Sequence, residues 1–133
     1  MPKNDNEVFA PKGLLKMLIL KIASMRATTG VEIMDEVPRL TDNVWSPSPG
    51  SVYYLLGEME EAGLLIRVPT GEAGIKRYVS SEKGKLCLEN FKLDAEKNLY
   101  KQVLMLKVLS DLAGNENVSE AVSILTKKLV VQN

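Results

Sequence analysis

The chain has 133 residues, 17 acidic and 17 basic side chains, one cysteine and no histidine. This length fits one domain with an appended helical arm. The lack of histidine removes the commonest general base and metal ligand, and the single Cys87 cannot build an internal disulfide or a structural zinc site. Neither a signal peptide nor an apolar run of membrane-spanning length is visible. We therefore expect a cytoplasmic protein that is not an enzyme, does not enter the membrane and uses no metal or cofactor.

The N-terminal part begins with a polar stretch, residues 1–10, which we expect to be a flexible arm. A first helix is predicted over residues 11–26. Lys12 and Lys16 fall mostly on its polar side and are candidates for contact with a phosphate backbone. The opposite side carries an apolar stripe at helical spacing, made of Leu14, Leu15, Leu18, Ile19, Ile22 and Met25.

A short second helix is predicted over residues 30–37. Thr29 followed by Glu32 matches a capping box, in which each side chain bonds the other residue's amide. Pro38 cannot donate a helical hydrogen bond and disfavours the helical region for the residue before it, so we expect the helix to end there. The polar loop that follows ends in Trp45, which we expect to pack this loop onto the helical core.

The third helix is predicted over residues 49–62 and has marked ends. Ser48 is a suitable N-cap, and Pro49 suits the first helical position, where its missing N–H costs nothing. Gly63 suits the position just past the end, where φ is positive. The buried stripe of this helix is expected to consist of Val52, Leu55, Leu56 and Met59.

The other face of the third helix carries Ser48, Ser51, Tyr53 and Tyr54, all near its N-terminus. Free amides and a partial positive charge at a helix N-terminus favour a phosphate nearby. Hydroxyls at this place can also bond phosphates or base edges. We therefore expect these four residues to contact DNA. The acidic second half of the helix should point away from phosphates; it carries Glu58, Glu60 and Glu61.

A β-hairpin is predicted next, with strands at residues 64–69 and 75–79 and a loop at 70–74 that contains two glycines. Lys76 and Arg77 begin the second strand, and successive side chains of a strand point to opposite faces. These two cations are the candidates for contact between the hairpin and phosphates.

The C-terminal part is predicted to form two helices. Ser81 caps a long helix that reaches Gly114, and a final helix covers residues 118–130. Their apolar surface is broader than one small domain can cover. Self-association is therefore expected, although a monomer whose helices fold back on its own core would also cover it. The predicted dimerisation residues are Leu99, Val103, Leu106, Val122, Leu125 and Leu129.

The run Trp45-Ser-Pro-Ser-Pro-Gly-Ser-Val-Tyr53 resembles the signature of the PadR family of transcriptional regulators, in which it opens the recognition helix. The resemblance implies a mainly α fold with a small β-hairpin: a winged helix-turn-helix DNA-binding domain over residues 11–80 and a helical dimerisation region over 81–133. Two positions depart from the family pattern. Val31 stands where a tyrosine is usual, and Ser80 where a leucine is usual.

By this resemblance the protein is a sequence-specific regulator, with repression as its expected action. A homodimer would bind a pseudo-palindromic operator in double-stranded DNA, and a small-molecule effector of unknown identity could take part. The drug pocket of one subgroup needs a tryptophan in the long helix, and the only tryptophan here is Trp45. Neutral net charge supports an alternative, a winged-helix module that binds proteins. Against it, basic residues cluster in two stretches, five within residues 1–26 and five within 65–85.

Overall fold

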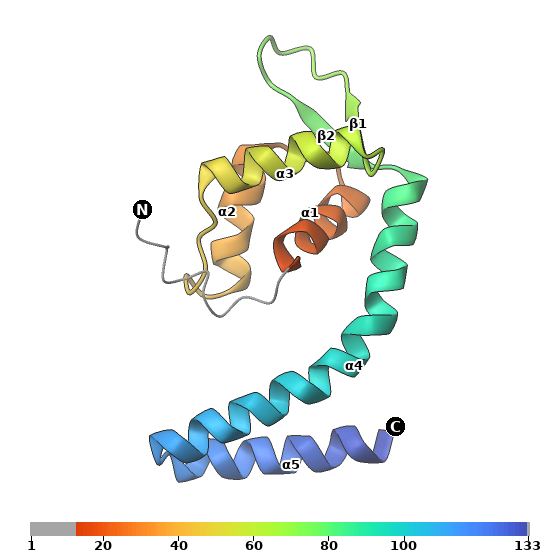
Figure 1. Cartoon of the computed structure of the whole chain (residues 1–133). Coiled ribbons are helices and arrows are strands. Elements are labelled where there is room, and N and C mark those ends of the chain that lie inside the picture. The colour runs from red at the N-terminus through yellow and green to blue at the C-terminus, as the bar shows by residue number, and fades with distance from the viewer. Residues whose placement is uncertain (1–12, 133) are drawn as a thin grey trace. The chain divides into compact units, whose positions relative to one another are not determined.

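The computed structural model describes residues 13–132 and divides into two compact units, the first ending at Glu89 and the second beginning at Asn90 (Figure 1). The described part is mainly helical with one antiparallel hairpin, as predicted. None of its helices is long and apolar enough to cross a membrane. The elements are α1 Leu14–Met25, α2 Gly30–Leu40, α3 Pro49–Glu61, β1 Leu65–Val68, β2 Arg77–Ser80, α4 Glu82–Ala113 and α5 Glu116–Gln132.

Helix α1 begins later than predicted. Gly13 precedes it with φ of 82°, in the left-handed region, so Leu14 is the first helical residue. The predicted arm over residues 1–10 and the candidate Lys12 lie outside the described residues.

Helix α2 does not end before its proline, and this prediction was wrong. Pro38 lies inside the helix, which continues to Leu40. The amide of Thr41 donates to the carbonyl oxygens of Val37 (3.2 Å) and Pro38 (3.3 Å), which closes the last turn. A proline removes one helical donor and crowds the preceding turn. So close to the C-terminus, the helix keeps its final hydrogen bonds beyond it.

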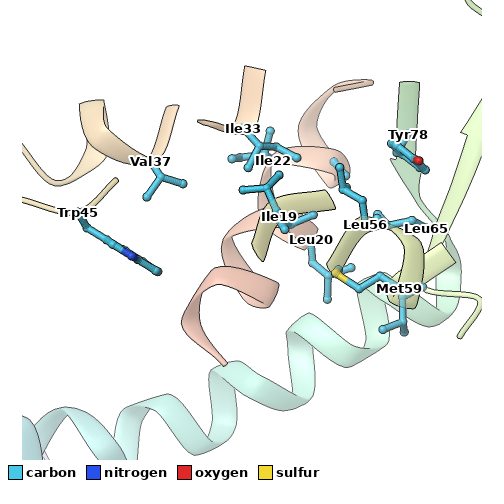
Figure 2. Packing of buried hydrophobic residues seen from close by; sticks show 13 residues of the cluster. Ile19, Leu20, Ile22, Ile33, Val37, Trp45, Leu56, Met59, Leu65 and Tyr78 are labelled. Carbon is cyan, nitrogen blue, oxygen red and sulfur yellow. The ribbon is translucent and has the colours of Figure 1, made fainter. Parts of the chain in front are cut away.

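The core of the first unit lies where α1, α2, α3 and the hairpin meet (Figure 2). Trp45 is only 6% exposed and belongs to this core, so its predicted packing role is confirmed. Of the predicted stripe of α3, Val52, Leu56 and Met59 are buried and Leu55 packs against the core from its edge. The other core residues are Ile19, Leu20, Ile22, Ala23, Ile33, Val37, Leu64, Leu65 and Tyr78.

The hairpin is held at its base by pairing on both sides of β2. Strand β1 pairs with it in antiparallel register, with Leu65 opposite Ser80 and Val68 opposite Arg77. On the other side, Thr28 and Tyr78 exchange two backbone hydrogen bonds of 2.9 and 2.8 Å. The predicted second strand began two residues too early, because pairing starts at Arg77.

Helix α4 starts tightly against the turn between α3 and β1. The Ser81 hydroxyl accepts the Gly84 amide at 3.0 Å, which confirms its capping role. The Ser81 amide donates to the Leu64 carbonyl oxygen at 3.0 Å. Gly84 is buried against that same carbonyl and against Leu20, which leaves no room for a side chain.

The second unit contains the rest of α4 together with α5. Ser119 donates a hydrogen bond of 3.2 Å to Ser110, which ties the two helices together. Helix α5 starts at Glu116, two residues earlier than predicted, because the side chain of Asn115 accepts the Val118 amide at 3.1 Å and caps it. The unit exposes many large apolar side chains, including Leu93, Leu99, Met105, Leu106, Val108, Leu109, Leu112, Ile124, Leu125 and Val130.

Candidate nucleic-acid interface

The start of α3 is organised by two serines. The Ser48 hydroxyl accepts the Ser51 amide at 3.1 Å, so its predicted capping role is confirmed. The same hydroxyl donates to the Ser51 hydroxyl at 2.8 Å. That bond uses the Ser48 proton and leaves the proton of Ser51 available for an acceptor outside the chain. The N-terminus of α3 therefore presents a pair of fixed hydroxyl groups.

The two tyrosines of α3 are both exposed but have different neighbours. Tyr53 is 52% exposed, and its ring lies directly over Gly30, where a Cβ atom would come within 2.5 Å of the ring. Tyr54 is 70% exposed, and a hydrogen bond to the Glu58 carboxylate raises the pKa of its hydroxyl. Tyr53 is thus placed by the start of α2, whereas Tyr54 is placed by the next turn of its own helix.

A cleft of about 690 Å³ lies between the start of α2, one face of α3 and the hairpin. Its walls are partly apolar, but five of its lining residues are charged. Three of the charged residues come from the hairpin and two from the helices. They are Arg67, Lys76 and Arg77 on the hairpin side, and Glu32 and Glu60 on the helix side.

Among the described residues, two ion pairs join the hairpin to the helices across this cleft. Nη1 of Arg77 in β2 lies 3.1 Å from Oε1 of Glu32 in α2. Nη2 of Arg67 in β1 lies 2.8 Å from Oε1 of Glu60 in α3. The Arg67 guanidinium also lies over the Tyr78 ring, 6.0 Å from its centre. The hydrogen bond to Glu60 raises the pKa of Arg67.

Glu32 serves two partners at once. Its Oε2 accepts the Thr29 amide at 3.1 Å, and the Thr29 hydroxyl accepts the Glu32 amide at 3.2 Å, so the predicted capping box is confirmed. Its carboxylate also accepts from Arg77. Partial burial acts to raise the pKa of Glu32, but the hydrogen bonds from Arg77 and Thr29 outweigh burial and lower it. Glu32 is therefore held in its charged form.

The basic residues that the sequence suggested for DNA contact do not all lie at the cleft. Lys76 is exposed and lies before β2, at the rim of the cleft, and Arg77 lies within the cleft. Lys16 is half-buried on α1 and does not line the cleft.

Sequence reasoning missed the pairing roles of Glu32, Glu60 and Arg67. The charge pattern of α3 predicts that Glu60 points away from phosphates, yet it faces the hairpin. Its partner is seven residues away across a turn, and the partner of Glu32 is 45 residues away. Local spacing gives no signal for either pair. Within residues 13–132 no cluster of three or more side chains suited to a metal ion is found.

Comparisons with known proteins give a family match over this same unit. The model of the transcriptional regulator PadR-like family matches residues 19–90. Among curated proteins, the Escherichia coli (strain K12) transcriptional regulator YqjI is 33% identical over 81 residues, which cover 61% of this chain and 39% of that protein. A protein from Shigella flexneri, also named YqjI, matches with the same identity. The match thus spans about two fifths of these relatives.

Several solved structures share the fold. A PadR family regulator from Clostridium difficile R20291 superposes with a TM-score of 0.55 at 23% identity, over 69% of this chain and 99% of that chain. Bacillus subtilis PadR, solved in complex with operator DNA, gives a TM-score of 0.52 at 18% identity, over 89% and 96%. A transcriptional regulator from Clostridium thermocellum gives 0.59 at 19%, over 70% and 88%.

Proposed function

The chain belongs to the PadR-like family of transcriptional regulators, and on this premise we propose that it is a homodimer that binds a pseudo-palindromic operator in double-stranded DNA and represses transcription. This family consists of regulators and not of enzymes, in agreement with the expectation from composition. Bacillus subtilis PadR, which shares the fold, is in complex with operator DNA, which supports DNA as the partner. A cytoplasmic location and a small-molecule effector complete the proposal.

The observation that carries the proposal is the exposed start of α3 beside the hairpin. Ser51, Tyr53 and Tyr54 offer hydroxyl groups at a helix N-terminus, where the partial positive charge favours phosphates. We propose that this end of α3 enters the major groove, where side chains read base edges. Ser48 contributes through its bond to the Ser51 hydroxyl as well as by its own oxygen.

We propose that the hairpin contacts the DNA backbone beside that groove. Lys76 is exposed and can neutralise one phosphate directly. Arg77 donates to Glu32 through Nη1, so Nε and Nη2 remain the donors that would face a phosphate. Lys12 and Lys16 are weaker candidates for backbone contact.

We propose that the C-terminal unit forms the dimer. Leu99, Leu106 and Leu125 are exposed in the single chain, and Val103 and Leu129 are half-buried. Val122 is already buried within the single chain, so its contribution would be to hold the unit together. A second copy would cover the exposed residues. Two half-sites would then lie about 34 Å apart, one turn of the DNA.

The first test is selection of bound fragments from genomic DNA, followed by fluorescence anisotropy on the selected operator. Tyr54→Ala and Lys76→Ala should weaken binding while the dimer persists in sedimentation. Lys21→Ala, at an exposed lysine of α1 outside the cleft, is the matched control and should bind like the original protein. Equal affinity of all three variants would remove these assignments.

A salt titration separates this proposal from a protein-interaction module. Binding to DNA should weaken with salt at a slope of about 0.9 per neutralised phosphate. Lys76→Ala should therefore make the slope shallower by about 0.9. If no genomic fragment is selected and binding to random DNA has no salt dependence, the protein-interaction module becomes the better reading.

A further inference from the structure

The hairpin is attached to the rest of its unit at its base. Each strand has four residues. Leu65 and Tyr78 are buried in the core, and Thr28 pairs with β2 through the backbone. The loop between the strands is almost wholly exposed. Arg67 and Arg77 lie toward the loop end of the paired strands, so beyond the base the orientation of the hairpin relative to α3 depends on what spans the cleft.

The two ion pairs span the cleft from different helices and hold different strands. Glu32, at the start of α2, holds Arg77 of β2. Glu60, near the end of α3, holds Arg67 of β1. An ion pair to one strand alone would leave the hairpin free to rotate about that contact, whereas ion pairs to both strands also restrict this rotation. The Glu32 carboxylate is itself held by the amide of Thr29, and Glu60 projects from the last turns of α3.

Building on the proposed DNA-binding function, we propose that Glu32 and Glu60 are positioning residues for DNA recognition: by holding Arg77 and Arg67 they fix the hairpin against α3, so that both elements reach the DNA in one arrangement. Simple charge arguments give the opposite expectation. Each carboxylate lies on the face that would meet phosphates, and its removal would then strengthen binding. The sign of the effect therefore separates positioning from plain repulsion.

The test compares Glu32→Gln and Glu60→Gln with Glu61→Gln in anisotropy titrations on the selected operator. Glutamine keeps the size and an acceptor oxygen, so the bond from the Thr29 amide survives. Glu61 is exposed, follows Glu60 on α3 and does not line the cleft. We expect two- to five-fold weaker binding for each cleft variant, roughly the effect of losing one exposed ion pair, and shallower salt slopes. Glu61→Gln should bind equally or more tightly.

Hydrogen exchange gives a second readout that does not need DNA. If Glu32 only caps α2, Glu32→Gln keeps the bond from the Thr29 amide and should leave exchange unchanged in residues 30–40 and in residues 65–80. Positioning predicts instead that residues 65–80 exchange up to about five-fold faster in both cleft variants.

The outcomes are distinct. Operator binding by the original protein, with cleft variants that bind equally or more tightly and exchange normally, overturns the positioning role alone. Failure of the original protein to bind any operator overturns the proposed function. Weaker binding together with faster exchange of the hairpin supports both.

Discussion

Gly84→Ala should strongly destabilise the first unit although it places a better helix former in a helix. Gly84 lies in the first turn of α4, where its amide bonds Ser81. A Cβ atom at this position would overlap the carbonyl oxygen of Leu64 and approach the Ser80 hydroxyl to 2.5 Å and Leu20 to 3.1 Å. The carbonyl is backbone and cannot rotate away as the end of a side chain could.

The magnitude follows from two opposing effects. Alanine in place of glycine contributes up to about 1 kcal/mol to a helix. Forcing an extra carbon into a packed core costs about 1–3 kcal/mol, and the upper end applies because the Leu64 carbonyl also accepts the Ser81 amide. We expect a net loss of about 2 kcal/mol. For a unit of this size that lowers the Tm by about 8–16 °C.

Trp45 makes the assay specific to this unit, because it is the only tryptophan and is buried in the core of the first unit. Thermal and urea unfolding followed by its fluorescence would report the loss. The matched control is Gly57→Ala in α3, where a Cβ would meet no described atom within 4 Å. The control should gain up to about 1 kcal/mol. A Gly84→Ala protein as stable as the original would refute the close packing described for α4.

Two residues of the cleft, Gly30 and Glu32, and one of the C-terminal unit, Leu106, offer further tests. Gly30→Ala would place a Cβ 2.5 Å from the exposed Tyr53 ring. Since that ring can swing aside, the free energy of unfolding should change by less than about 1 kcal/mol, while operator affinity measured by anisotropy should fall as in Tyr53→Ala. An unchanged affinity would argue against a role for the ring. The pKa of Glu32 is lowered from its ordinary value of 4.5, so its stabilising contribution is present above that pH and is lost as the pH falls below it. The Tm difference between the original protein and Glu32→Gln should therefore be present at neutral pH and vanish in acid. A difference that stays constant with pH would contradict the ion pair. Leu106→Glu, at an exposed position of α4, should convert the dimer to a monomer in sedimentation velocity and leave the unfolding transition followed by Trp45 fluorescence unchanged. A dimer that persists would show that Leu106 is not part of the interface.

The sequence predicted best those features that depend on neighbouring residues. The cap at Ser48, the capping box at Thr29 and the helix end at Gly63 are all local, and each is present. Gly63 has φ of 79°, and the Leu64 amide reaches back to the Met59 carbonyl at 2.9 Å. The Trp45–Tyr53 motif led to the family and hence to the fold class.

Two kinds of feature lay beyond local reasoning. Pro38 predicts a helix end, because a proline removes a donor wherever it stands. Whether the last turn survives depends on Thr41, whose amide donates to the carbonyl oxygens of Val37 and Pro38. The pairs Glu32–Arg77 and Glu60–Arg67 arise only once the hairpin folds back over α2 and α3. Glu60, expected from its helix to point away from phosphates, thus pairs across the cleft with Arg67 through tertiary structure alone.

The first turns of α4 belong to the unit that carries the candidate interface, which matters for any attempt to isolate that unit. A fragment cut after Ser80 would remove the Ser81 amide that bonds Leu64 and would uncover the core beneath Gly84 and Cys87. Limited proteolysis should accordingly yield a stable N-terminal piece only when cleavage falls beyond Glu89. The smallest N-terminal fragment that folds should therefore include the first turns of α4, the helix that continues into the second unit.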